Sequence, residues 1–200
     1  VIWPALLLAA GRPLPKKIFV HGFFTIVGQK ISKSLKNVID PLELTAKFGN
    51  DALRYFLLRE FSFGEDGDFS LEKLKNRYRN ELANDLGNLV QRVLTLVKKD
   101  NLKATHKKVK IPLRIEELIS DLKFKEALDE IWLLVNKANR AIDQEKPWAL
   151  EKRKRANFLS KLLEQISIIA ESLAPFLPET SREIKTQIKT LKIKPLFPKQ

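Results

Sequence analysis

Apolar side chains with helical spacing dominate the chain from residue 71 onward and limit what it can fold into. The first stripe follows Ser70, whose hydroxyl can cap a helix. Its members recur every three or four positions: Leu71, Leu74, Tyr78, Leu82, Leu86, Leu89, Val93 and Leu96. Further stripes run over 124–142 and 159–173, and a weaker helix is predicted over 179–191. Because each stripe must be buried against another, this part predicts a helix bundle.

Short elements of mixed type precede residue 65. Residues 16–22 and 23–28 predict two β-strands with turn glycines. Residues 40–49 carry helix signals, with a capping aspartate, a proline at the first helical position and a closing glycine. A second helix is predicted with Asn50 as its cap. These elements suit the last βα portion of an α/β domain, and the glycine-rich segment FGEDGDFS predicts a turn-rich joint.

The balance of charge favours a polyanionic partner. The chain has 37 Lys and Arg against 24 Asp and Glu, a net charge of +13, which is typical of proteins that bind nucleic acid or an acidic membrane surface. The absence of cysteine excludes thiolate zinc sites, disulfides and cysteine catalysis. His21 and His106 have no partners at ligand spacing, so we predict no metal site. No apolar run approaches the roughly 20 residues that span a bilayer, so we expect no membrane partner and a cytoplasmic location.

The segment GQKISKSLKN, residues 28–37, places flexible cations and hydroxyls just after a predicted strand. Lysine suits phosphate as a mobile point charge, and a loop can close over a ligand. Composition alone does not separate this hypothesis from a solvated surface turn, which is the commoner fate of such a cluster.

Two further features have both a functional and a structural interpretation. Asn80, Asn84, Asn88 and Arg92 recur every four residues on the first long helix and could contact RNA or form hydrogen bonds within the bundle. Trp148 directly follows a proline at a helix junction, where it could stack on an unpaired base or plug the bundle. Trp132 lies within an apolar run, which favours a core position.

Residues 30–34, KISKS, resemble the KMSKS loop of class I aminoacyl-tRNA synthetases, with Ile31 in the methionine position. A longer ordered series resembles the methionyl-tRNA synthetases. Its segments are IWPALLLAAGRPLPKKIFVHGF, FGNDALRYFLLRE, FGEDGDFS, NELANDLGNLVQR, QEKPWAL and KPLFPK. The resemblance implies a mostly α fold. Residues 1–64 would be the C-terminal part of a Rossmann-type α/β catalytic domain with the loop and a connector, and 65–200 an α-helical anticodon-binding domain.

The resemblance also implies an enzyme, a methionine–tRNA ligase that uses ATP with Mg²⁺ to activate methionine. The ATP-binding loop would comprise Lys30, Ile31, Ser32, Lys33 and Ser34. Lys30 and Lys33 would be catalytic, because they stabilise negative charge as the methionine carboxylate attacks the α-phosphate. Trp3 matches a residue that walls the methionine pocket.

The implied macromolecular partner is tRNA(Met) with a CAU anticodon. The residues that match its binding site are Asn80, Asn84, Arg92 and Trp148, with Trp148 stacking on a base. These assignments follow from the resemblance.

One departure bears on activity. The HIGH motif, the zinc-bearing insertion and the first half of the nucleotide-binding fold would all precede residue 1. We therefore expect this chain to be inactive without an N-terminal half, which a separate chain could carry together with any zinc. The alternative function is a non-catalytic tRNA- or RNA-binding module derived from the synthetase. A membrane-surface helix protein is a more distant alternative.

Overall fold

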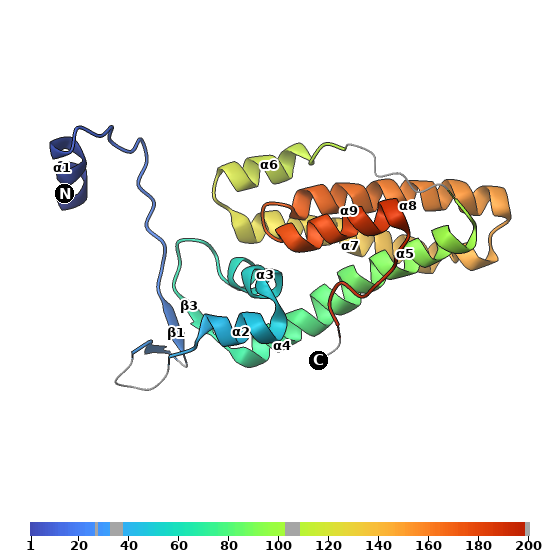
Figure 1. Ribbon diagram of the computed structural model, residues 1–200, viewed down its shortest axis with the longest axis horizontal. Coiled ribbons are helices and arrows are strands. Elements are labelled where there is room, and N and C mark those ends of the chain that lie inside the picture. The colour runs from blue at the N-terminus through green and yellow to red at the C-terminus, as the bar shows by residue number, and fades with distance from the viewer. Residues whose placement is uncertain (27, 33–37, 103–108, 199–200) are drawn as a thin grey trace.

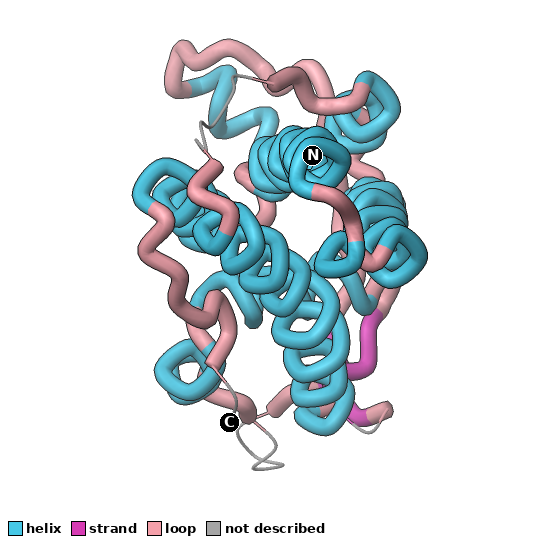
Figure 2. Tube along the Cα trace, turned by 90° about the vertical axis from the view of Figure 1, so that its right-hand side faces the viewer, coloured by secondary structure: helices cyan, strands magenta, loops and turns pink. Residues whose placement is uncertain are grey.

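The computed structural model describes residues 1–26, 28–32, 38–102 and 109–198. In this part of the chain, helices predominate and the strands are confined to one side (Figures 1 and 2). The elements in chain order are α1 (Ile2–Ala9), β1 (Phe24–Ile26), β2 (Gln29–Lys30), α2 (Pro41–Phe48), α3 (Asn50–Glu60), β3 (Gly67–Phe69), α4 (Leu71–Arg77), the π-helix η1 (Tyr78–Gly87), α5 (Asn88–Lys99), α6 (Leu113–Ser120), α7 (Phe124–Glu145), the 3₁₀ turn η2 (Pro147–Ala149), α8 (Lys152–Leu173) and α9 (Pro178–Thr190).

The predicted helix bundle is confirmed. The stripes on the long helix, α7, α8 and α9 supply most of one continuous core, to which α6 also contributes. Trp132 is buried, as predicted, with its ring centroid 4.5 Å from that of Tyr55. The helices thus stabilise one another by removing their apolar faces from water.

The first long helix runs without a break from Leu71 to Lys99, but its middle is a π-helix. Ser70 caps it as predicted, accepting a hydrogen bond from the Lys73 N–H at 3.4 Å. In a π-helix each N–H bonds five residues back, so one turn contains more residues than in an α-helix and each residue rotates the chain by a smaller angle. The periodic pattern therefore predicted the extent of this helix but not the rotation between its two ends.

The cap signals of α2 act as predicted. Asp40 accepts a hydrogen bond from the Leu42 N–H at 2.8 Å, and Gly49 ends the helix with a φ of +88° that favours glycine. The prediction for Asn50 was wrong, because this residue lies inside α3 and its side chain makes no capping bond.

A small three-stranded sheet has the order β2-β1-β3. β1 pairs antiparallel with β2 and parallel with β3, with Thr25 opposite Lys30 on one side and opposite Asp68 on the other. The predicted strand over 16–22 does not form, because β1 takes both of its neighbours from other segments. Phe19 instead stacks on Phe63, with ring centroids 4.7 Å apart. The predicted turn-rich joint contains β3.

The hydrophobic core continues across residue 64, the predicted boundary between the two domains. α3 packs on α7, and Asp51 on α3 accepts a hydrogen bond of 2.6 Å from the Thr180 N–H in the first turn of α9. Arg54 donates to the carbonyls of Phe176 and Pro175, at 2.7 and 3.0 Å. α2 and α3 are therefore fastened to the bundle, whereas α1 has no buried residue and stands apart from it (Figure 1).

No helix in the described ranges is long and apolar enough to cross a membrane.

Candidate functional site

The sheet holds the base of the predicted nucleotide loop. Asp68 on β3 accepts hydrogen bonds from the Thr25 hydroxyl at 2.8 Å and from the Gly28 N–H at 2.9 Å. These hydrogen bonds lower the pKa of Asp68 below its ordinary value, and the bond from Gly28 has the larger effect. Asp66 accepts in the same way from the Phe23 N–H, at 2.7 Å. These carboxylates therefore fix the turn that leads into the loop.

Sequence reasoning took the two aspartates as turn residues and missed this role. The available signal was weak, because nothing local shows that the segment FGEDGDFS returns to pair with residues 24–26.

The predicted loop residues are only partly described. Lys30 lies on β2 and is exposed, as is Ile31, and Ser32 follows them. Lys33 and Ser34 lie outside the described residues. Trp3, the predicted methionine-pocket residue, is 58% exposed on α1, which lies away from β1 (Figure 1). The described residues therefore do not bring Trp3 and Lys30 together.

The opposite end of the molecule presents an exposed tryptophan. Trp148 sits in η2, at the junction of α7 and α8, and is 56% exposed, whereas the preceding Pro147 is buried. A side chain this exposed does not plug the bundle. Arg92 on α5 donates to Asp143, near the end of α7, at 2.8 Å. The Arg92 guanidinium and the exposed Trp148 ring thus lie on elements near the end of α7.

The asparagines of the predicted row line different recesses. Asn84 lines a recess with Lys47 and Arg79, whereas Asn80 lines a different one with Glu60 and Lys73. Both lie in the π-helix, while Asn88 and Arg92 lie one turn apart on α5. Asn88 is therefore the asparagine of the row that lies nearest to Arg92 along the helix.

The alternative interpretation of the row was hydrogen bonding within the bundle. Asn80, Asn84 and Asn88 are exposed, and their side chains form no hydrogen bond with any other described residue. Asn139 makes such a bond instead, from its side-chain amide to the Asp85 carbonyl at 3.1 Å. The three exposed amides are therefore available to a ligand.

Polar and charged side chains join the π segment to α3. Glu81 accepts from the Tyr55 hydroxyl and pairs with Arg77, while Arg59 pairs with Asp129 on α7. The pKa values of Tyr55 and Asp85 are raised, mainly by burial and secondly by the negative charge of nearby Glu81. Hydrogen bonds and ion pairs therefore link α3 to both η1 and α7.

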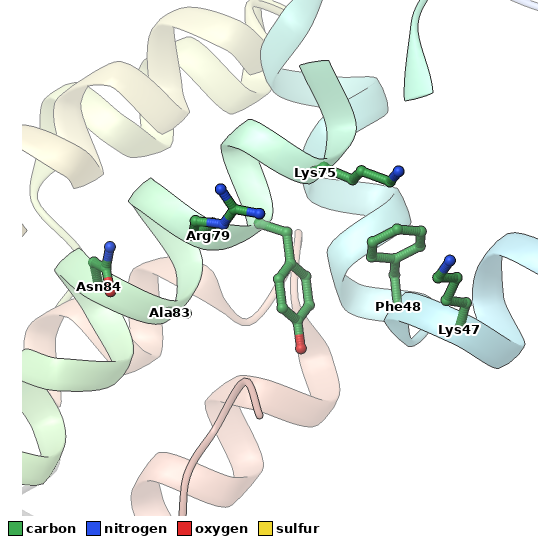
Figure 3. Close-up of a pocket in the computed structure, with 7 residues that line it drawn as sticks. Lys47, Phe48, Lys75, Arg79, Ala83 and Asn84 are labelled. Carbon is green, nitrogen blue, oxygen red and sulfur yellow. The ribbon is translucent and has the colours of Figure 1, made fainter. Parts of the chain in front are cut away.

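The recess that contains Asn84 has a volume of about 490 Å³ and a basic lining (Figure 3). Lys47 and Phe48 reach it from α2, and Lys75, Arg79 and Asn84 from the long helix. The members of this group come from two segments separated by the whole of α3, so no local pattern in the sequence links them.

Among the described residues, no cluster of three or more His, Cys, Asp or Glu side chains is placed to hold a metal ion.

Comparison with known proteins identifies relatives of this chain. Residues 1–94 match the family described as tRNA synthetases class I (M). The methionine–tRNA ligase of Caldanaerobacter subterraneus subsp. tengcongensis is 43% identical over 94% of this chain and 32% of its own length. That of Thermotoga maritima is 40% identical over 92% of this chain and 32% of its own length. The chain thus spans about a third of these curated relatives.

Solved structures show the same relationship. Mycobacterium tuberculosis methionyl-tRNA synthetase in complex with methionyl-adenylate superposes with a TM-score of 0.81 at 31% identity. The superposition covers 100% of this chain and 47% of that protein. The apo form of the same enzyme gives a TM-score of 0.76. The chain is therefore homologous to part of the methionyl-tRNA synthetases.

Proposed function

We propose that this chain is the C-terminal part of a methionine–tRNA ligase, supplying the nucleotide loop and the surface that recognises the anticodon. The observation that carries the proposal is that the whole chain superposes on a methionyl-tRNA synthetase whose structure contains methionyl-adenylate. By this homology, the substrates would be methionine, ATP with Mg²⁺ and tRNA(Met) with a CAU anticodon.

The anticodon surface is proposed at the end of the bundle that carries Trp148. Its exposed ring can stack on an unpaired base, and the Arg92 guanidinium can grip a base or a phosphate. We add Asn88, whose exposed amide lies one turn from Arg92 and can read a base edge. Asn80 and Asn84 lie farther along the same helix, and we propose that their exposed amides also contact the anticodon.

The proposed catalytic contribution is the loop 30–34. Lys30 and Lys33 would stabilise the negative charge that develops as pyrophosphate leaves. Ser32 and Ser34 would hold the shape of the loop, and Ile31 would complete it. Asp68 would support this loop by fixing the turn before it. Trp3 would wall the methionine pocket.

We further propose that adenylate formation needs an N-terminal half with the HIGH motif, provided by another part of the polypeptide or by a separate chain. Large apolar side chains at 1–24 are exposed in this structure, including Ile2, Leu6 and Phe23. An exposed apolar surface of this kind is typical of an interface with another domain or chain.

Titration with RNA tests the anticodon proposal. The chain is titrated with tRNA(Met) and with the same tRNA carrying a changed CAU triplet, each at two salt concentrations, because a charge of +13 alone causes salt-sensitive binding. Preference for CAU that persists at the higher salt concentration supports the proposal. Equal and salt-sensitive binding of both RNAs contradicts it.

The alternative function, a non-catalytic RNA-binding module, has a separate test. Pyrophosphate exchange is measured after addition of an N-terminal half from a homologous enzyme. Restored exchange supports the ligase, and intact CAU binding without exchange supports the module.

A further inference from the structure

Arg155, near the start of α8, connects two other elements through its guanidinium. Its Nε and one terminal nitrogen donate to the two carboxylate oxygens of Asp100, at 2.5 and 2.9 Å. The other terminal nitrogen donates to the Leu150 carbonyl at 3.2 Å. Asp100 caps the C-terminal end of α5, and Leu150 ends the turn η2, two positions after Trp148. The guanidinium therefore links the end of α5 to the turn that carries the exposed tryptophan.

Both partners of this ion pair lie at helix ends that disfavour their charge. The C-terminal end of a helix carries partial negative charge and the N-terminal end partial positive charge, so α5 disfavours the Asp100 carboxylate and α8 disfavours the Arg155 guanidinium. The Asp100 side chain is only 8% exposed, and a charge removed from water in this way is unfavourable unless it is paired. Each charge is therefore stabilised by the other rather than by its own helix.

The direction of the Trp148 side chain depends on the backbone of η2. A little over half of the surface of Trp148 is exposed, so packing against neighbours covers less than half of it. Before the ring, the backbone is held by the buried Pro147 and by Lys146, which adopts a φ of +44°. After the ring, the bond from Arg155 to the Leu150 carbonyl holds it.

The other members of the proposed anticodon surface lie on α5, the helix that Asp100 caps. Asn88 and Arg92 precede Asp100 by twelve and eight positions, which corresponds to about 18 and 12 Å at the rise of an α-helix. A helix is rigid over this length, so the position of Asp100 fixes the positions of both side chains. Recognition of a triplet requires that side chains on different elements keep fixed relative positions.

We propose that Arg155 and Asp100 are positioning residues for anticodon recognition, which hold Trp148 in register with Asn88 and Arg92. Arg155 acts through the turn rather than by contact with RNA, because its three nitrogens already donate to protein groups and its side chain is 23% exposed. The inference rests on the proposed function, since it requires that Trp148 contacts the anticodon.

The preference for CAU tests the proposal. It is the ratio of the affinities of the 200-residue chain for tRNA(Met) and for the same tRNA with a changed triplet. General attraction between charges affects both RNAs equally and cancels in this ratio. The test variant is Arg155→Gln. The matched control is Lys154→Gln, which removes the same charge from the adjacent position, where the side chain is 72% exposed and pairs only with Glu151, at 3.7 Å.

Arg155→Gln should reduce the preference for CAU by at least about 5-fold, the lower limit for the loss of one base–aromatic stack. Asp100→Asn should reduce it by a similar factor. Arg155→Lys should behave like Arg155→Gln, because an ammonium group keeps the charge but cannot form the three bonds of the planar fork. Lys154→Gln should keep the parent preference. A parent-like preference in Arg155→Gln or in Arg155→Lys would overturn the proposal.

A double-mutant cycle with Trp148→Ala distinguishes positioning from a separate contribution to binding. If Arg155 acts through the tryptophan, Arg155→Gln should cause no further loss of preference once Trp148 is alanine. Urea unfolding establishes that each variant is folded at the temperature of the titration, and Asp100→Asn replaces Arg155→Gln in the cycle if the latter is not folded. Additive losses would overturn this inference alone. A Trp148→Ala variant with the parent preference would refute the proposed function, and this inference with it.

Discussion

Replacement of Trp148 by alanine separates RNA recognition from folding. One base stacked on an aromatic ring contributes about 1–3 kcal/mol to binding, so Trp148→Ala should weaken the binding of tRNA(Met) by about 5- to 150-fold. The preference for CAU over a changed triplet should fall as well, because the lost contact is with a base.

The same replacement should cost less stability than the removal of a fully buried tryptophan. Trp148 is 56% exposed, so folding removes a little under half of its surface from water. A tryptophan buries at most about 250 Å², and at about 25 cal/mol per Å² the change costs no more than about 2–3 kcal/mol of unfolding free energy.

Trp132→Ala is the matched control. This ring is 3% exposed and packs on Tyr55, so its removal should cost about 3–5 kcal/mol in urea unfolding. Fluorescence anisotropy with labelled tRNA, at a temperature where both variants are folded, gives the affinities. If Trp148→Ala unfolds as easily as Trp132→Ala and binds tRNA like the parent, then Trp148 is a packing residue and the stacking hypothesis is wrong.

Three other changes test separate parts of the structure. Asp68→Ala should abolish the protection of the Gly28 amide against hydrogen exchange. In the parent, this protection should be complete above the ordinary pKa of Asp68 and should be lost as pH falls through its lowered pKa. Protection that does not depend on pH would contradict the role assigned to Asp68. Asp51→Ala should cost about 1–2 kcal/mol, since it removes the acceptor at the first turn of α9, and an unchanged urea midpoint would show that the cap contributes nothing. Lys33→Ala, in an enzyme completed by an N-terminal half, should slow adenylate formation with nearly unchanged tRNA affinity, and equal loss of both would refute the division of roles.

The sequence determined the secondary structure where the causes are local. Ser70 and Asp40 cap their helices through bonds to amides two or three positions away, and Gly49 supplies a conformation that other residues disfavour. The apolar stripes identified the faces that the bundle buries, and the neighbours of Trp132 indicated its core position. These features depend on residues within about one or two helical turns, so a linear pattern contains them.

Only the tertiary structure decided which distant residues meet. The π segment changes the rotation of the long helix, so that Asn80, Asn84 and Arg92 face different surroundings although their spacing is regular. Asp68 bonds to Gly28 forty positions away, and the strand predicted over 16–22 fails because β1 finds its partners elsewhere. Such outcomes depend on the path of the whole chain and on competition between possible partners, and neither is encoded in the residues next to each position.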